Sequence, residues 1–323
     1  MSTVVPDPLA PAPIDRQGIR LGDVLFKGVA LVAAVGVAVL LAFLTYKIFN
    51  LAWPAMKEFG ASFIWTQAWN PNTSVYGALV FIYGTLVTSF IALLLATPLS
   101  IAIALFLTEL APRRLAAPIA TMVELLAAIP SVVLGLWGIL VFGPWVAQHL
   151  EPWLQSWFGF LPIFSGDPSQ SGVLPAALVL TIMIIPITSA ICRELFSRVP
   201  RDLSDGSLAL GSTRWEAIRK VAIPYAAPGI SAAVLLGLGR AFGEAIAVTQ
   251  VIGGGNSINR SLFPPGDTLA SRIASTYRGA SSNLEVQSLL YLGAILLVIS
   301  LITNVSAQVI VNKFQKARRM STG

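Results

Sequence analysis

The chain has 323 residues, of which 55% are hydrophobic and only 11% are charged, and its formal net charge is +6. Soluble domains carry about 25% charged residues, so this composition excludes an ordinary water-soluble protein and indicates an integral membrane protein. The single cysteine, Cys192, excludes an internal disulfide, and no Cys/His spacing suits a zinc ion. We therefore expect this chain to bind no metal and no cofactor.

Six apolar runs are long enough to cross a bilayer, because about 20 helical residues span its hydrocarbon core. They lie near residues 25–52, 76–108, 115–142, 173–196, 226–252 and 286–312. Pro98, Pro130 and Pro186 lie inside three of these runs, and each is expected to kink its helix. The pattern predicts an all-α integral membrane domain of six helices over residues 25–312.

The Lys and Arg residues predict the orientation of this domain. Most of the 21 lie in the Pro-rich segment 1–24, in segment 313–323, in the loop between the second and third runs and in the loop between the fourth and fifth. Because Lys and Arg gather on the cytoplasmic side of membranes, both termini are predicted to be cytoplasmic. Segment 1–24 is expected to be a disordered tail, and 313–323 a basic tail.

A tryptophan-rich stretch without Lys or Arg, "PWVAQHLEPWLQSWFGFLP" (144–162), then falls on the outer side. Its indole rings suit a membrane-interface belt, on a helix that lies along the bilayer surface. Ligand stacking is the less favoured alternative.

The sequence lacks the motifs of the common catalytic sites. No G-x-x-x-x-G-K-[ST] phosphate loop occurs, and no nucleophile elbow or paired-carboxylate site stands out. We therefore expect a chain that is not an enzyme by itself.

The loop between the fourth and fifth runs carries strong helix signals. A first helix is predicted over about 202–210, ending at Gly211, the residue that best tolerates a left-handed C′ position. A second helix is predicted to begin at Thr213, which has capping-box spacing to Glu216. This second helix is expected to end near Pro224.

The same loop, residues 198–224, resembles the EAA motif of ABC-importer permeases. Asp205 takes the acidic position, Gly211 follows it by six residues, and "VAIP" occupies the place of I-x-L-P, although "DGS" replaces E-A-A. The resemblance implies a cytoplasmic coupling helix that sits in a cleft of a separate ATPase subunit. The candidate coupling residues are Asp205, Gly211, Arg214, Trp215, Glu216 and Pro224.

Three further stretches extend the resemblance. They are "ELLAAIPSVVLGLWG" (124–138), "LGRAFGEAIAVTQVIGG" (238–254) and "LFPPGDTLASRIA" (262–274). Together they are similar to permease subunits of the bacterial phosphate-specific (Pst) ABC importer, and more to the PstC type than to its paralogue, over about residues 75–312.

The resemblance implies a six-helix, type I (MetI-like) permease in the bacterial cytoplasmic (inner) membrane, which moves inorganic phosphate by alternating access. The implied partners are a PstA-like second permease, two ATPase subunits that use ATP and Mg, and an extracytoplasmic phosphate-binding protein, but no nucleic acid.

Two charges lie inside the fifth apolar run. Arg240 and Glu244 are four residues apart, so a continuous helix would place them on one face. An Arg at a bilayer centre costs about 2.5–3.5 kcal/mol on insertion scales, and a buried ion pair rarely recovers its desolvation cost. A self-neutralising pair remains the structural alternative, but stability is a poor reason to keep both charges.

The functional hypothesis is that both residues line the translocation path. A guanidinium is a forked donor that suits phosphate oxygens. Phosphate at neutral pH still carries a proton, unlike sulfate, so the Glu244 carboxylate is expected to accept that hydrogen bond. The resemblance points the same way, since the matching Arg and Glu are implicated in phosphate transport.

Other charges are weaker candidates. Glu124 lies inside the third run and is a further substrate-path candidate, expected to pair with Arg240 or with a helix of a partner subunit. In the fifth-to-sixth loop, Arg260, Arg272 and Arg278, like Asp267, are expected to be solvated charges. Docking of a substrate-loaded binding protein is the less favoured alternative for the three arginines.

Competing functions remain for the chain as a whole. A permease for another oxyanion, such as sulfate or molybdate, would share the coupling loop. A secondary transporter would need no ATPase, and a structural or sensory membrane subunit would move nothing.

Overall fold

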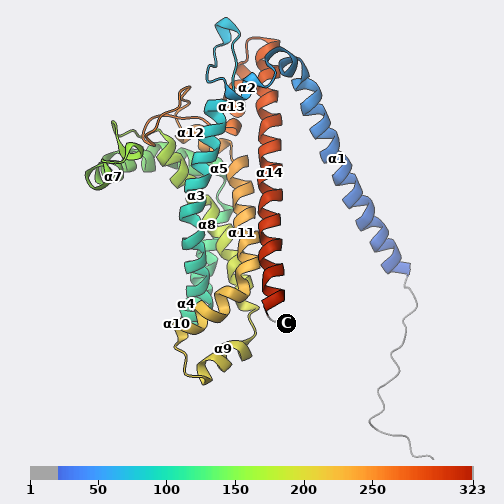
Figure 1. The fold of residues 1–323 in the computed structure, drawn as a ribbon, viewed down its shortest axis with the longest axis vertical. Helices are drawn as coiled ribbons and strands as arrows, with labels where there is room; N and C mark the ends of the chain where they lie inside the picture. The colour runs from blue at the N-terminus through green and yellow to red at the C-terminus, as the bar shows by residue number, and fades with distance from the viewer. Residues whose placement is uncertain (1–20, 322–323) are drawn as a thin grey trace, which may run out of the picture. The chain divides into compact units, whose positions relative to one another are not determined.

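The computed structural model describes residues 21–321, and every named element in this range is helical (Figure 1). The chain divides at Lys47, inside α1, into a first unit of residues 1–47 and a second unit of residues 48–323. The elements are α1 (Leu21–Phe59), α2 (Ser62–Trp65), η1 (Pro71–Thr73), α3 (Leu79–Leu105), η2 (Phe106–Leu110), α4 (Arg113–Ala128), α5 (Ser131–Trp137), η3 (Gly138–Phe142), α6 (Gly143–Trp145), η4 (Val146–Leu150), α7 (Glu151–Phe158), η5 (Pro162–Phe164), α8 (Val173–Ser197), α9 (Arg201–Ala209), α10 (Arg214–Ala217), η6 (Ile218–Ala222), α11 (Ile223–Gly243), α12 (Ile246–Val251), α13 (Leu269–Thr276), η7 (Tyr277–Gly279) and α14 (Asn283–Ser321).

Six helical segments within the described range are long and apolar enough to cross a membrane, as the sequence predicts. They are Val24–Phe59, Leu79–Leu110, Ser131–Phe158, Val173–Ser197, Arg214–Gly243 and Asn283–Ser306. Of the predicted N-terminal tail, residues 1–20 lie outside the described part of the chain, whereas 21–24 already belong to α1. At the other end α14 continues as a helix to Ser321, through most of the predicted basic tail.

The third predicted run, 115–142, is not one helix. It is divided into α4 and α5 at Ile129 and Pro130, whose ψ angles of 125° and 139° are extended. Proline lacks the N–H of a helical hydrogen bond and keeps the residue before it out of the α region. The expected kink is therefore a complete break, and the membrane-length segment begins after it. Pro98 and Pro186, by contrast, lie inside the uninterrupted α3 and α8.

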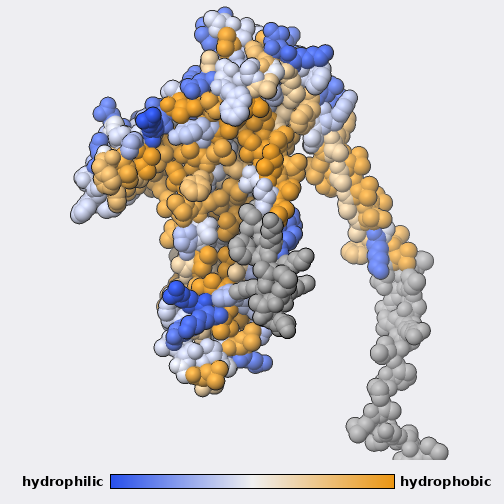
Figure 2. Space-filling view, viewed as in Figure 1, coloured by the Kyte–Doolittle hydropathy of each residue, from blue (hydrophilic) through white to orange (hydrophobic). Residues whose placement is uncertain are grey.

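The core of the second unit is built around α8, which packs along α3 and also against α11, α4 and α12. Small side chains such as Ala92 and Ala96 of α3 and Ala176 of α8 are fully buried there, beside Leu180 and Ile184. Small residues let helices approach closely, which is the main source of helix packing in a membrane. Figure 2 shows the apolar surface over the middle of this unit, with hydrophilic patches at its ends.

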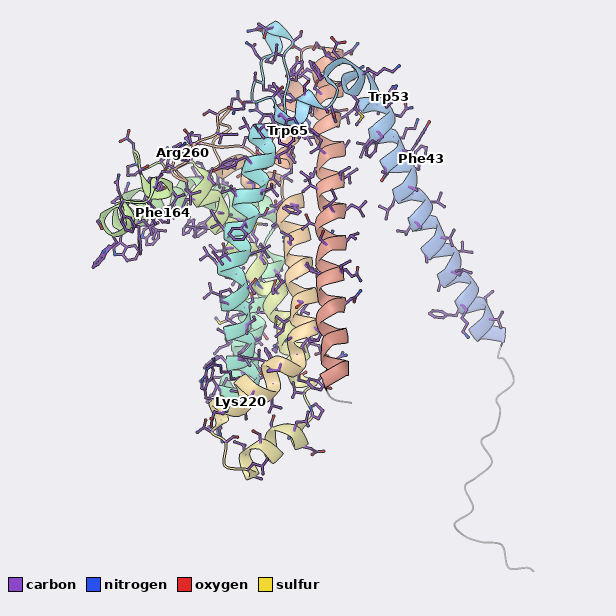
Figure 3. The ribbon with its side chains drawn as sticks, viewed as in Figure 1. Phe43, Trp53, Trp65, Phe164, Lys220 and Arg260 are labelled. Carbon is purple, nitrogen blue, oxygen red and sulfur yellow. The ribbon has the colours of Figure 1, made fainter. Side chains whose placement is uncertain are left out.

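The two ends of the second unit carry different elements, which we call the α9 end and the α13 end. Lys220 marks the α9 end and Arg260 the α13 end in Figure 3. At the α13 end the segment from η3 to α7 leaves the direction of α3 and extends to the side (Figure 1). Trp145, Trp153 and Trp157 are exposed on this arm. Their exposure is consistent with the predicted interface belt.

Candidate functional site

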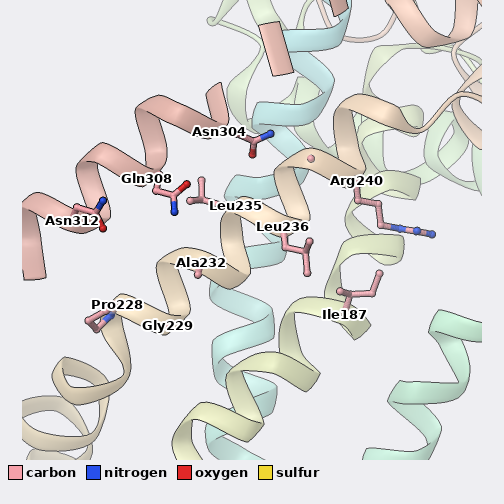
Figure 4. A pocket seen from close by; sticks show the side chains of 11 residues that line it. Ile187, Pro228, Gly229, Ala232, Leu235, Leu236, Arg240, Asn304, Gln308 and Asn312 are labelled. Atoms are coloured by element: carbon pink, nitrogen blue, oxygen red, sulfur yellow. The ribbon is translucent and has the colours of Figure 1, made fainter. Parts of the chain in front are cut away.

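Arg240 lies in the last turn of α11, beside an open groove of about 970 Å³. A positive charge in this position complements the negative end of the helix dipole, which is worth about 0.3–1 kcal/mol. The groove runs over a face of α11 made largely of small and apolar residues, including Gly229, Ala232 and Gly239. Figure 4 shows Arg240 and Ile187 of α8 at one margin and the polar side chains of α14 at the other.

Glu244 is not in the same helix as Arg240, which corrects the prediction of one continuous fifth helix. α11 ends at Gly243, Glu244 has an extended ψ of 108°, and α12 begins at Ile246. The two charges therefore do not share a helical face, and no ion pair joins them in the described chain. The Glu244 Oε1 atom accepts a hydrogen bond of 3.2 Å from the Ala247 backbone N–H. The half-buried carboxylate, one residue before the N-cap Ala245, thus satisfies one N–H of the first turn of α12.

The helix break has a chemical consequence. The last carbonyls of α11 and the first N–H groups of α12 lack intrahelical partners, as at every helix end. In membrane transporters such interruptions are tolerated where they line a cavity, and they commonly form part of a substrate or ion site. The break lies directly after the last turn of α11, which holds Arg240.

Glu124 forms an ion pair with Arg193, not with Arg240. Arg193 lies within α8, near its end, and Glu124 lies in α4, so the pair joins two packed helices. The expected partner of Glu124, Arg240 or a helix of a partner subunit, is therefore corrected to a residue of its own chain. Both side chains stay partly exposed, so the pair contributes only about 0–1 kcal/mol to stability.

The helix signals of the 198–224 loop are largely confirmed. α9 spans Arg201–Ala209, and Gly211 has a φ of +90°, the left-handed value that favours glycine. The capping box of Thr213 and Glu216 is present: the Thr213 N–H donates to Glu216 Oε2 at 3.0 Å, and the Glu216 N–H donates to Thr213 Oγ1 at 3.3 Å. These local signals were therefore reliable.

The predicted end of the second helix near Pro224 is wrong. α10 passes through the π-helical η6 into α11, so the helical run from Arg214 to Gly243 is continuous. Pro224 is the second residue of α11, directly after the π-helical η6, and it does not interrupt the run. At 1.5 Å per residue, one helical run of about 40 Å connects Arg214 to Arg240.

A polar hollow of about 770 Å³ lies between α9, the α10–η6 segment and the adjoining ends of α3 and α8. Asp205, Arg201 and Arg214 line it, together with Glu109 of η2. On the surface, Trp215 is 62% exposed and Leu210 is 90% exposed. Large apolar side chains displayed this openly beside charged groups are typical of a protein–protein contact.

Arg272, predicted as a solvated charge or a docking residue, is buried at the α13 end. Its Nε lies 3.0 Å from Asp267 Oδ2, and the two side chains are only 12% and 1% exposed. The guanidinium also bonds to the Asn256 side chain and lies over the Phe81 ring, 4.7 Å from its centroid. Neither Asp267 nor Arg272 is therefore a solvated charge, and Arg272 is unsuited to bind another protein.

Burial determines the titration of this pair. Desolvation raises the pKa of Asp267 above its ordinary value, and the charge of Arg272 and hydrogen bonds from Ser271 and Thr268 oppose that rise. Desolvation likewise lowers the pKa of Arg272, against the attraction of Asp267 and Glu285. The other two docking candidates, Arg260 and Arg278, are exposed.

Three polar residues of the groove were not predicted from the sequence. Asn304, Gln308 and Asn312 of α14 line it opposite Arg240 (Figure 4). Their spacing of four places them on one helical face, so the signal was present in the sequence. A neutral amide near the end of an apolar run is not by itself a sign of a binding site. Only the packing of α14 against α11 shows that these amides line the groove.

Known proteins resemble this chain over most of its length. Residues 96–316 match the family model described as binding-protein-dependent transport system inner membrane component. A protein of Pasteurella multocida named phosphate transport system permease protein PstC is 41% identical over 94% of this chain and 96% of its own length. A protein of the same name from Mesorhizobium japonicum is 44% identical over 87% of each chain.

Solved structures show the fold. A chain of a bacterial ABC transporter involved in the import of alginate superposes with a TM-score of 0.58 at 17% identity, over 90% of this chain and 99% of that one. A chain of the MetNI methionine ABC transporter in an inward-facing conformation gives a TM-score of 0.53, also at 17% identity, over 72% of this chain and 94% of that one. The predicted six-helix, MetI-like permease fold is confirmed by this likeness and by the helices themselves.

Proposed function

We propose that this chain is a permease subunit of an ATP-driven importer of inorganic phosphate. It belongs to the family of binding-protein-dependent transport system inner membrane components. The names of relatives that are 41% and 44% identical over most of the chain support phosphate as the substrate. The structural observation that carries the proposal is the unbroken helical run from Arg214 to Gly243. It joins the 198–224 loop to the groove of Arg240.

The helical run supplies a route for mechanical coupling. An ATPase subunit binds Trp215 and Leu210 at the α9 end, with Asp205, Arg214 and Glu216 around them. Closure of the ATPases displaces α9 and α10, and the continuous helix carries that displacement to Arg240. Gly211 and the capping box fix the angle between α9 and this run. The pore thereby alternates between outward-open and inward-open states.

Arg240 supplies the charge that attracts the anion. Its guanidinium is exposed at the groove and has no ion-pair partner among the side chains described by the structure, so it is available for phosphate oxygens. Glu244 follows at the helix break, with Oε1 bonded to the Ala247 N–H. Its other carboxylate oxygen accepts the hydrogen bond of phosphate's own proton. Sulfate has no proton to offer there and is repelled. Glu124 holds α4 against α8 through Arg193 and acts indirectly on the path.

The remaining parts of the importer belong to other chains. A second, PstA-like permease completes the pore, two ATPase subunits bind ATP and Mg at the α9 end, and an extracytoplasmic phosphate-binding protein docks at the α13 end. Arg260 and Arg278 are the exposed arginines there that remain candidates for that contact. The α9 end and both termini face the cytoplasm of a bacterium, and this chain itself catalyses no reaction.

Reconstituted transport tests the proposal. We expect proteoliposomes that contain the four-part complex and the binding protein to take up ³²P-labelled phosphate only with internal ATP and Mg. Arg240→Gln is expected to lower uptake by about tenfold or more, because a hydrogen bond to a charged group is worth about 1.5–3 kcal/mol. Arg114→Gln, the same substitution at an exposed arginine away from the groove, is the control.

The outcomes separate the alternatives. Uptake that survives ATP depletion would contradict an ABC importer and indicate a secondary transporter. Competition by sulfate or molybdate at the same concentration as phosphate would indicate a permease for another oxyanion. For Glu244→Gln, an unchanged preference for phosphate over sulfate would rule out proton recognition by Glu244.

A further inference from the structure

Three amide side chains form a row on one face of α14. Asn304, Gln308 and Asn312 follow one another at intervals of four residues, so the row extends over about 12 Å of the helix. All three line the groove, at the margin opposite Arg240 (Figure 4). We call these three residues the amide row.

The amide row is not accounted for by contacts within the chain. None of its side chains has a hydrogen-bond partner among the side chains that the structure describes. Across the groove, α11 presents Gly229, Ala232 and Leu235, which offer no polar side-chain group. Asn304 lies inside the membrane-length segment Asn283–Ser306, where polar side chains face other helices or a water-filled cavity, and Gln308 and Asn312 follow just beyond its end. The exposed amide row therefore gives the groove a polar margin that is open to a polar occupant.

The chemistry of the amides suits a protonated oxyanion. Each amide offers two N–H donors and one carbonyl acceptor, and hydrogen phosphate has both oxygen acceptors and a P–OH donor. A neutral amide also holds an anion less strongly than a second arginine would, because it adds no charge. Moderate binding at several successive positions is the condition for an ion to enter a path and also to leave it.

The amide row runs along the groove from one end of α11 toward the other. In Figure 4, Asn304 lies toward the Arg240 end of α11, and Asn312 lies near Pro228, at the start of that helix. The row therefore leads from the charged end of the groove toward the end that carries α9 and α10. Arg240 supplies charge at one point, and the amides continue the polar surface beyond it.

We propose that the amide row of α14 is a neutral phosphate path, along which the anion passes from Arg240 toward the α9 end. This proposal rests on the proposed function, phosphate import. The competing explanation is that the amides bond to a helix of the second permease, as amides do between membrane helices. The position of the row on the same groove as Arg240 favours a path, because the amides then continue the anion-binding surface that begins at that charge.

Cysteine labelling tests access to the row. Cys192 is the sole cysteine and is buried in α8, so Cys192→Ala gives a background without thiols. On this background Gln308→Cys in the nucleotide-free complex is expected to react with a membrane-impermeant, negatively charged thiosulfonate. Added inorganic phosphate is expected to slow that reaction, because it occupies the same position. Ile302→Cys, which the helical period places away from the row, is the control, and phosphate should not alter its labelling.

Transport measurements test whether the amide row carries phosphate. Gln308→Leu is expected to lower ATP-driven phosphate uptake by about tenfold, as expected for the loss of one hydrogen bond to a charged group, while ATPase activity and co-purification of all subunits persist. Gln308→Glu keeps the size and polarity of the side chain but adds a negative charge, so it is expected to lower uptake further. Ser306→Leu, a polar-to-apolar change on the other side of α14, should leave uptake unchanged.

The results separate three conclusions. If wild-type proteoliposomes take up no phosphate, the proposed function itself fails. If the wild type transports phosphate and both Gln308 variants match it, the amide row is not a path. If Gln308→Leu releases the second permease during purification, or if phosphate does not protect Gln308→Cys, the row is a helix contact and the proposal is overturned.

Discussion

The two ends of the second unit differ in how their charged residues are held. At the α9 end the ion pairs Arg198–Glu194 and Lys220–Glu216 connect neighbouring turns of a helix and are exposed. Exposed pairs of this kind contribute little to stability, because water screens their attraction. At the α13 end the single pair Asp267–Arg272 is almost completely buried. The charges at the α9 end are therefore accessible to another molecule, whereas the pair at the α13 end is used internally.

Packing follows the same division. Trp69 meets Tyr76 and Phe81 edge to face at 4.9 and 5.4 Å beside Arg272, in an aromatic cluster at the α13 end. Gly84 of α3 allows the Asp267 backbone to lie directly against that helix, since any Cβ there would overlap it. At the α9 end, no described aromatic ring packs on the exposed Trp215. One end is thus fixed by its own contacts, and the other is suited to receive a partner and to move with it.

The largest loss of stability is expected from Arg272→Met, which would break the buried ion pair with Asp267. Removal of one partner leaves the Asp267 carboxylate buried without its countercharge, at a cost of about 3–5 kcal/mol. Thermal unfolding of the detergent-purified chain measures the loss. The double variant Asp267→Asn with Arg272→Met should recover part of it. If the single variant unfolds like wild type, the α13 end is not fixed by this pair.

A smaller effect, on binding and not on folding, is expected from Trp215→Ala. An exposed tryptophan at the centre of a contact is typically worth about 2 kcal/mol or more, or about thirtyfold in affinity. Titration of the purified ATPase onto the permease measures this affinity, and the unfolding temperature should not change. Trp157→Ala makes the same substitution at an exposed residue of the α13 end. Equal effects of the two variants on ATPase binding would remove the distinction between the ends.

The smallest effect is a pH dependence confined to the α13 end. Because burial raises the pKa of Asp267 in the folded state, the folded chain binds more protons than the unfolded chain above the ordinary value of 3.8. Stability is then expected to fall as pH rises from that value through the folded-state pKa. Asp267→Asn should remove this contribution. Unfolding temperatures of the wild type and the variant, measured across the acid range, check this prediction. A wild-type unfolding temperature that rises relative to the variant as pH rises would contradict it.

Much of the fold and part of the site were predictable from spacing alone. Gly211 and the Thr213–Glu216 capping box lie within one or two turns of each other, so their residue types define their local geometry. The partner of Glu124 was not predictable in this way. Arg193 is 69 residues distant in the sequence, and only the packing of α4 on α8 brings the two together.

The sequence by itself determined that the chain lies in a membrane and that it forms helices there. An 11% charged composition with six long apolar runs requires a membrane, and backbone groups in lipid require helices. Tertiary structure decided what each charge does. It separated Arg240 from Glu244 by a helix break, buried Arg272, joined the loop to α11 and placed the amide row across a groove. Desolvation and pairing depend on neighbours that are distant in sequence, whereas helix periodicity and caps depend on residues a few positions away.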